Sequence, residues 1–433
     1  MTVSLDVRRN PALLKLDLYC RGLRMDESCF VEEDGGRKIM RTRAGLGSGL
    51  EAILPGGLWT NVPVVESFAQ SSPYILLKKE NGAYRLFRDG EFVAPLRLSP
   101  RPAWYGLRTS TGKDMTRVGS LQGTYLGIYP AKVCEYWTEP KNVRTNCRFC
   151  SVGLNLGVDD ATEKSVDEVL EVVRAAREQS GITYVDFNSG HYEGDTYLDI
   201  LEPYIRAVKS ETNLLIGIQT PPHRDLERYD ALKAMGVNRV SFCFEIFDEP
   251  RFKEICPGKD REYGLERYLD AVRYCAELGR RKPSLSQPWV TNGEIIAGLE
   301  APESSIRAID WITGVGAIPT VCVFRPVIGT DLETMPPPRT EDMVPVFRRL
   351  YEACMEKGLP IGVAPNVHVS LVMLPEECAS LSPRSFPLKR AKLAILGAFF
   401  RPRFQRSVDR AIAHSAFERA RRSSAPERMT PVV

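Results

Sequence analysis

Long apolar runs are missing from this chain of 433 residues. The longest, AKLAILGAFF at residues 391–400, is about half as long as the stretch that a helix needs to cross a bilayer. We therefore expect no membrane-spanning segment. The opening residues, MTVSLDVRRN, also lack the apolar core of a secretory signal peptide, which predicts a cytoplasmic protein.

The cysteine content does not suit a disulfide framework. The chain has 11 cysteines, an odd number, and they are spread along its whole length. Such a pattern fits a reducing compartment better than a set of paired bridges. The cysteines are therefore not expected to cross-link the fold.

The positive charge is concentrated at the C-terminal end. The net charge of the chain is +3, yet residues 384–433 alone carry 12 Lys or Arg against three Asp or Glu, which leaves the rest at −6. Within this end, PLKRAKLAILGAFFRPRFQRSVDRAI mixes basic and apolar residues, which predicts a basic amphipathic helix. Packing on the main domain is favoured slightly over contact with an anionic membrane surface, and a solvated, partly disordered end is the third alternative. Because no aromatic-rich binding module accompanies the helix, a nucleic-acid partner is not expected.

The first 120 residues indicate an α+β extension. NPALLKLDLYCRGL is typical of a helix, with Pro11 in its first turn. The stretch from residue 73 to residue 98 alternates apolar and polar residues around Asn81-Gly82 and Asp89-Gly90, which predicts two β-hairpin turns.

From about residue 121 the pattern changes to alternating strands and helices. Ser165 and Glu168 form a capping box at the start of the first long helix. About six β/α units follow one another, which predicts an α/β fold with a parallel sheet, namely a partial (β/α)6 TIM-like barrel. The predicted regions are the extension at 1–120, the barrel at 121–335, its last helix and a closing segment at 336–383, and the basic helical tail at 384–433.

Three cysteines lie close together just after the first predicted barrel strand. Twelve residues separate Cys134 from Cys147, and two separate Cys147 from Cys150. The carboxyl ends of barrel strands are where such folds place their chemistry. A structural zinc site needs four protein ligands, and no histidine lies within forty residues of Cys150. A 4Fe–4S cluster held by three thiolates would instead leave one iron open to a small molecule.

The CRFC sequence resembles the second half of the motif of the radical S-adenosylmethionine (radical SAM) superfamily, including the aromatic Phe149 before the last cysteine. The usual motif has three residues in its first gap where this chain has twelve. The resemblance covers about residues 122–335 and is strongest to the biotin-synthase-like branch. It implies a 4Fe–4S cluster on Cys134, Cys147 and Cys150, with S-adenosylmethionine on the free iron.

The same resemblance implies a reaction and an electron donor. Reductive cleavage of S-adenosylmethionine would give a 5′-deoxyadenosyl radical, which abstracts hydrogen from, or adds to, an unidentified small-molecule or lipid-like substrate. A flavodoxin- or ferredoxin-type protein would supply the electron. Further S-adenosylmethionine contacts are implied at the ends of later strands: Asn188, Ser189 and Gly190 for the amino group, Glu245 for the ribose, Lys259 for the carboxylate, and Gly298 and Phe324 for the adenine.

Four more residues at predicted strand ends are candidates for contact with the substrate. His191 and His223 suit acid–base or hydrogen-bonding roles, and Arg325 could pair with a carboxylate or phosphate. Cys243 could return a hydrogen to a substrate radical. Each has a structural alternative: a polar loop residue for the histidines, an ion pair for the arginine and a buried thiol for the cysteine.

Two other classes of function remain open from the sequence. The first is a non-catalytic iron–sulfur or zinc protein, which the absent fourth ligand disfavours. The second is a cluster-free barrel lyase, which needs a lysine or paired carboxylates at strand ends, and only Glu245 and Lys259 come near this arrangement. The sequence does not identify the substrate.

Overall fold

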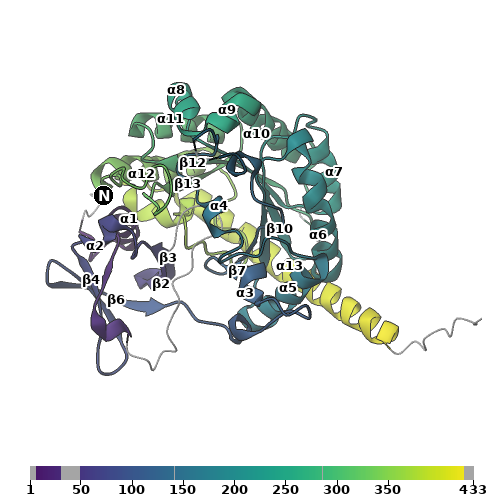
Figure 1. Ribbon diagram of the computed structural model, residues 1–433, viewed down its shortest axis with the longest axis horizontal. Helices are drawn as coiled ribbons and strands as arrows, with labels where there is room; N and C mark the ends of the chain where they lie inside the picture. The colour runs from purple at the N-terminus through teal and green to yellow at the C-terminus, as the bar shows by residue number, and fades with distance from the viewer. Residues whose placement is uncertain (1–5, 31–48, 141, 285, 424–433) are drawn as a thin grey trace, which may run out of the picture.

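The computed structural model describes residues 6–30, 49–140, 142–284 and 286–423. These residues form a six-stranded sheet near the N-terminus and a seven-stranded sheet in the main domain. In Figure 1 the first sheet (purple to blue) lies beside the second, which is surrounded by helices. The extensive apolar core includes side chains from both parts.

The N-terminal part begins with helix α1, Pro11–Arg21, whose N-cap Asn10 accepts a hydrogen bond from the backbone of Leu13. Antiparallel strands β4, β5 and β6 follow the predicted hairpins, with turns at Asn81-Gly82 and Asp89-Gly90. Both turn glycines have positive φ angles, which glycine adopts without steric cost. The helix and both hairpins are confirmed. The strands of this sheet are β1 Arg24–Met25, β2 Leu50–Leu54, β3 Leu58–Val62, β4 Tyr74–Lys78, β5 Tyr84–Arg88 and β6 Glu91–Leu98.

The second sheet contains six consecutive parallel strands, with a short antiparallel strand, β7, at one edge. This arrangement confirms the partial (β/α)6 barrel. Strands buried on both faces are nearly continuous apolar runs, as in Leu-Ile-Gly-Ile of β10. The strands are β7 Ser120–Leu121, β8 Leu126–Ile128, β9 Tyr184–Asn188, β10 Leu215–Gln219, β11 Arg239–Glu245, β12 Val290–Ala297 and β13 Ile318–Val323.

Helices cover the outside of these strands (Figure 1). The capping box of Ser165 and Glu168 is present at the start of α5, as predicted. Two short helices, α8 and α9, form an insertion after β11 that the sequence analysis did not predict. The helices are α2 Ser67–Gln70, α3 Met115–Val118, α4 Val152–Asn155, α5 Val166–Ser180, α6 Tyr197–Thr212, α7 Arg228–Met235, α8 Glu249–Ile255, α9 Pro257–Glu262, α10 Gly264–Arg281, α11 Pro302–Gly314 and α12 Thr340–Lys357.

The basic C-terminal segment forms one long helix, α13, Pro387–Ser423 (yellow in Figure 1). Its Phe404 and Val408 side chains are buried against the barrel. The helix also packs on α6, where Arg419 forms an ion pair of 2.7 Å with Glu211. The predicted helix and its packing on the main domain are therefore confirmed. Among the described residues, no helix combines the length and the apolarity that a membrane crossing requires.

Candidate functional site

A cavity of about 130 Å³ lies at the carboxyl ends of the barrel strands. The last residues of three neighbouring strands, Asn188, Gln219 and Glu245, contribute to its wall. All three cysteines of the motif line it as well. The predicted residues in its lining are Cys134, Cys147, Phe149, Cys150, Asn188, Ser189, Gly190, His191, Cys243, Glu245 and Lys259.

The twelve-residue gap folds back so that the cysteines share one cavity. The guanidinium of Arg144 lies 4.1 Å from the ring centroid of Trp137, which packs the loop on itself. Backbone hydrogen bonds then attach the loop to the α8–α9 insertion, from Arg148 N to the Ile255 carbonyl and from Gly258 N to the Thr145 carbonyl. The long first gap is thus accommodated by an insertion elsewhere in the chain.

Backbone N–H groups point at two of the sulfur atoms. His191 N lies 3.3 Å from Cys134 Sγ, and Val152 N lies 3.5 Å from Cys150 Sγ. Such donors stabilise thiolates, which are the form that binds a metal. The three thiols line one cavity without meeting at a point, since within the described chain no three His, Cys, Asp or Glu side chains converge on a single metal ion.

Burial favours the neutral form of two of these thiols. It raises the pKa of Cys134 to about 11 and that of Cys150 to about 12. The pKa of Cys147 is lowered instead, because the thiol of Cys256 hydrogen-bonds to it. Cys256 joins α8 to α9 and is fully buried. Sequence spacing did not place this fourth thiol at the site, because more than a hundred residues separate it from the motif.

The turn after β9 is built for close approach to the cysteine loop. A Cβ atom on Gly190 would lie 2.5 Å from Cys134 Cβ and 2.9 Å from the Tyr129 hydroxyl, so a larger residue does not fit there. In the same turn, Asn188 Oδ1 and Ser189 Oγ are buried and have no hydrogen-bond partner among the described atoms. Buried polar atoms normally have partners, so these two fit a polar ligand in the cavity.

Glu245 and Lys259 form a buried ion pair in the cavity wall. Lys259 Nζ lies 2.8 Å from Glu245 Oε1 and also donates to the carbonyl of Cys243. Although burial opposes the charge, the Glu245 carboxylate and the nearby cysteines raise the pKa of Lys259 well above its usual value. Glu245 itself has a φ of 69°, a conformation that is costly for a residue other than glycine. A charged pair held in strained backbone is typical of a ligand site.

His191 and Cys243 also face this cavity. The imidazole of His191 stacks on Tyr136 with ring centroids 4.4 Å apart, and its Nδ1 lies 2.5 Å from the Tyr263 hydroxyl. Burial lowers its pKa, so the ring is neutral at neutral pH. The Cys243 thiol lies 3.8 Å from Gln219 Oε1.

Four predicted site residues do not line this cavity in the described part of the chain. They are His223, Gly298, Phe324 and Arg325. The His223 ring bonds within its own turn, to the backbone of Asp225 at 2.9 Å. Phe324 is buried and packs near Gly298. A position at a strand end places a residue on the right face of the barrel, but it does not determine where the side chain points.

Arg325 instead connects the barrel to the N-terminal sheet. Its guanidinium donates to Asn61 Oδ1 at 3.0 Å and lies 5.0 Å from the ring centroid of Tyr19. Burial lowers its pKa. Arg325 therefore has a structural role, but its partners are an amide oxygen and an aromatic ring instead of the carboxylate of the predicted ion pair.

The lumen of the barrel holds a polar network that the sequence analysis missed. The Arg239 guanidinium donates to Asp186 at 3.2 Å, to Asn292 at 3.0 Å and to Ser241 at 3.1 Å. Glu294 accepts from Ser241 at 3.2 Å, and burial raises its pKa to about 7. Charged residues inside otherwise apolar strands were the available signal.

The chain is similar in sequence to known proteins. The model of the Radical SAM superfamily matches residues 144–301. Bacteriochlorophyllide c C-7(1)-hydroxylase of Chlorobaculum limnaeum is 24% identical over 313 residues, which cover 66% of this chain and 74% of that protein. An uncharacterized protein of Methanocaldococcus jannaschii is 26% identical over 201 residues, 45% of this chain and 49% of its own length.

Two solved structures are also similar. Methylornithine synthase (PylB) has a TM-score of 0.41 at 16% identity, covering 68% of this chain and 90% of its own. The FeFe-hydrogenase maturase HydG from Carboxydothermus hydrogenoformans has a TM-score of 0.37 at 18% identity, covering 53% and 52%. The superfamily match spans strands β9 to β12 together with Cys147 and Cys150. Residues 144–301 thus match the Radical SAM superfamily, and the chain is similar to an enzyme, the hydroxylase of Chlorobaculum limnaeum.

Proposed function

We propose that Cys134, Cys147 and Cys150 hold a 4Fe–4S cluster whose remaining iron binds S-adenosylmethionine. The observation that carries this proposal is that three cysteines spaced by twelve and two residues line one cavity at the carboxyl ends of the strands. The match of residues 144–301 to the Radical SAM superfamily supports the same assignment. When bound, the cluster and S-adenosylmethionine supply one-electron cleavage of the C5′–S bond and a radical that takes hydrogen from carbon.

The protein's own groups would bind and orient the cofactor. The unpartnered Asn188 Oδ1 and Ser189 Oγ suit its amino group, and Gly190 leaves the space that the adjoining cysteine loop needs. Lys259 would offer a cation to the methionine carboxylate and Glu245 would accept from the ribose hydroxyls; the two side chains are held together as an ion pair. Phe149 lines the cavity next to the cysteines, where its ring would help to exclude water. Gly298 and Phe324 remain proposed adenine neighbours from the ends of β12 and β13.

For contact with the substrate we retain His191 and Cys243, because both line the cavity. A neutral imidazole that shares a hydrogen bond with Tyr263 can position a polar group of the substrate or accept its proton. The Cys243 thiol, whose pKa burial raises well above its usual value, is a hydrogen donor rather than a nucleophile. His223 and Arg325 are not retained, since each is engaged elsewhere.

The substrate is proposed to be a small or lipid-like organic molecule whose C–H bond is broken. The name of the Chlorobaculum limnaeum relative, a hydroxylase of a bacteriochlorophyllide, supports chemistry at carbon. We propose a cytoplasmic enzyme that receives its electron from a flavodoxin- or ferredoxin-type protein.

The test is anaerobic reconstitution with iron and sulfide, followed by dithionite and S-adenosylmethionine. We expect the absorption of a 4Fe–4S cluster and formation of 5′-deoxyadenosine. Cys134→Ala, Cys147→Ala and Cys150→Ala should each lose both. Cys354→Ala, which removes a buried thiol in α12 far along the chain, is the matched control and should retain both. Equal cluster content in all four variants would refute the assignment.

We also propose that the outward face of α13 contacts an anionic membrane surface. Leu388, Ile395, Phe399 and Phe417 are 86%, 59%, 59% and 65% exposed. They are spaced by seven, four and eighteen residues, close to whole numbers of helical turns, so they share one face. Basic residues on or beside that face are Lys392, Arg403, Arg406 and Arg410. Exposed apolar side chains among lysines and arginines are typical of interfacial helices.

Vesicle sedimentation tests this second proposal. The full chain should bind vesicles containing phosphatidylserine, bind neutral phosphatidylcholine vesicles less, and dissociate as salt is raised. Replacing Ile395 and Phe399 by serine should weaken binding. Phe92→Ser, at an exposed phenylalanine of the N-terminal sheet, should leave it unchanged. Binding that ignores lipid charge would contradict the proposal.

A further inference from the structure

A second cavity, of about 430 Å³, opens at the opposite end of the barrel from the cysteines. The first residues of five successive strands line it: Tyr184, Leu215, Arg239, Val290 and Ile318. The cysteine cavity is lined instead by the last residues of such strands. We call this second cavity the base cavity. Its volume is that of an ordinary small-molecule site.

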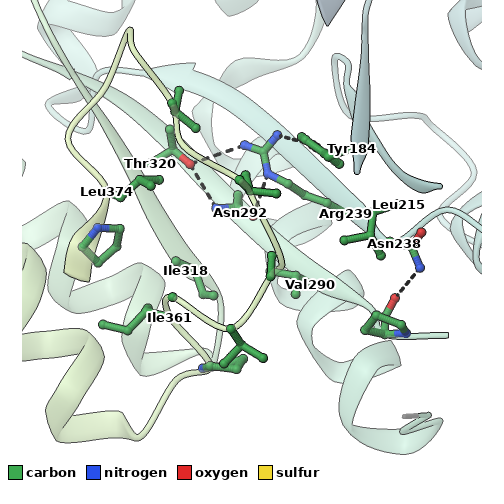
Figure 2. Close-up of a pocket in the computed structure, with 18 of the residues that line it drawn as sticks. Tyr184, Leu215, Asn238, Arg239, Val290, Asn292, Ile318, Thr320, Ile361 and Leu374 are labelled. Atoms are coloured by element: carbon green, nitrogen blue, oxygen red, sulfur yellow. Dashed lines mark hydrogen bonds between the residues drawn. The ribbon is translucent and has the colours of Figure 1, made fainter. Parts of the chain in front are cut away.

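Most of the wall of the base cavity is apolar. Val290, Ile318, Ile361 and Leu374 contribute apolar side chains to this wall (Figure 2). Phe400 of α13 also lines the cavity, so the C-terminal helix forms part of its boundary. An elongated apolar ligand would therefore contact apolar side chains on several sides.

The inner end of the base cavity is polar, and its one guanidinium is already engaged. Arg239 donates to Asn292, Tyr184, Asp186, Ser241 and Thr320, and three of these partners are labelled with it in Figure 2. A guanidinium has five N–H groups, so this set of acceptors occupies its donors. An anionic ligand would find no free donor on this arginine.

The inner end of the base cavity has more hydrogen-bond acceptors than donors. Asp186 Oδ2 is buried without a hydrogen-bond partner among the described atoms. Glu294 Oε1 has only the weak thiol donor of Cys322, at 3.7 Å. Two carboxylates thus share one guanidinium, and both line the base cavity. The inner end therefore favours a ligand group that donates hydrogen bonds and carries positive charge.

We propose that the base cavity binds an amphiphilic amine, with its ammonium group at Asp186 and Glu294 and its apolar body against Val290 and Ile318. Gln219 lines both this cavity and the cysteine cavity, so the bound head group lies one side chain away from the cysteine site. The base cavity thereby adjoins the cysteine cavity from beneath the barrel, as a second ligand site. Its catalytic meaning depends on the proposed function, whereas the binding itself does not.

The test is calorimetric titration of the reconstituted full-length enzyme, without reductant or S-adenosylmethionine, so that no turnover occurs. The probes are octylamine, octanol and octanoate, which share one apolar chain and differ in the head group. We expect saturable binding of octylamine, with octanol weaker and octanoate weaker by roughly tenfold or more, the difference that one charge-assisted hydrogen bond makes.

Two variants locate the binding. Glu294→Gln keeps the shape of the side chain and should weaken octylamine by roughly tenfold while leaving octanol little changed. Ile318→Trp should fill the cavity and abolish binding of all three probes. If that variant does not fold, Leu374→Trp fills the cavity from another lining position. Val65→Trp, at an exposed position in the N-terminal part, is the control and should bind as the native chain does.

The outcomes separate this proposal from the radical chemistry. Equal affinity for amine and carboxylate, or octylamine binding that survives a tryptophan in the cavity, overturns it. An enzyme that makes 5′-deoxyadenosine but does not bind octylamine retains the proposed function and loses the amine site. An enzyme that binds octylamine but holds no cluster retains the amine site and loses the proposed function.

Discussion

Glu294 gives the sharpest quantitative prediction, because its carboxyl lies inside the barrel with few compensating contacts. Burial, and next the neighbouring Glu245, raise its pKa from an ordinary 4.5 to about 7. Below pH 4.5 the group is protonated in both the folded and unfolded chains and has no effect. Between pH 4.5 and 7 the unfolded chain loses the proton first, so native stability falls as pH rises.

The magnitude follows from the pKa difference, since one pKa unit corresponds to about 1.4 kcal/mol. Between pH 5 and pH 8 the native protein should lose about 2 to 3 kcal/mol that Glu294→Gln does not lose. Urea unfolding of both proteins at the two pH values measures this difference, and titrating groups remote from Glu294 cancel in the comparison. Glu227→Gln, at an exposed carboxylate, is the control. Parallel stability curves for native and Glu294→Gln protein would refute the argument.

Two further predictions concern the cysteine cavity. Gly190→Ala should displace Cys134 and lower the iron content after reconstitution several-fold. Gly314→Ala is the control and should leave the iron content unchanged, because an added Cβ there meets nothing within 4 Å. Iron and sulfide assays measure the difference. Lys259→Met leaves the Glu245 carboxylate buried and unpaired, so it should lower the free energy of unfolding by about 3 to 5 kcal/mol. Adding Glu245→Gln should recover most of that loss in urea unfolding, and a double variant no more stable than the single one would contradict the pairing.

The fold was largely predictable because its signals are local. Capping at Ser165, turn glycines in the hairpins and apolar runs in the strands each act within a few residues. The α8–α9 insertion was missed because each helix has fewer than eight residues, too short for an apolar period to emerge. Its signal was chemical instead: Asp248 caps α8 by accepting from Arg251 N, with a proline in the first turn.

The candidate site was predictable only in part, since it depends on contacts between distant segments. The spacing of the three motif cysteines and the family resemblance predicted a shared site, and all three line one cavity. Cys256 could not, because its approach to Cys147 depends on how the insertion packs against the cysteine loop. Arg325 was placed at the right strand end, but its side chain turns to the N-terminal sheet, whose position no local pattern determines.

The network of Arg239, Asp186 and Glu294 poses a different question, namely why it exists at all. Buried ion networks are weak sources of stability, and well-packed apolar residues of similar volume often serve as well or better. Elsewhere this barrel does use apolar residues, as at Val240 and Phe242 of the same strand. The network also requires Gly217, where an added Cβ would lie 1.8 Å from the Tyr184 hydroxyl. A costly arrangement with incompletely satisfied acceptors, at the inner end of an apolar cavity, is better explained by a bound ligand than by folding.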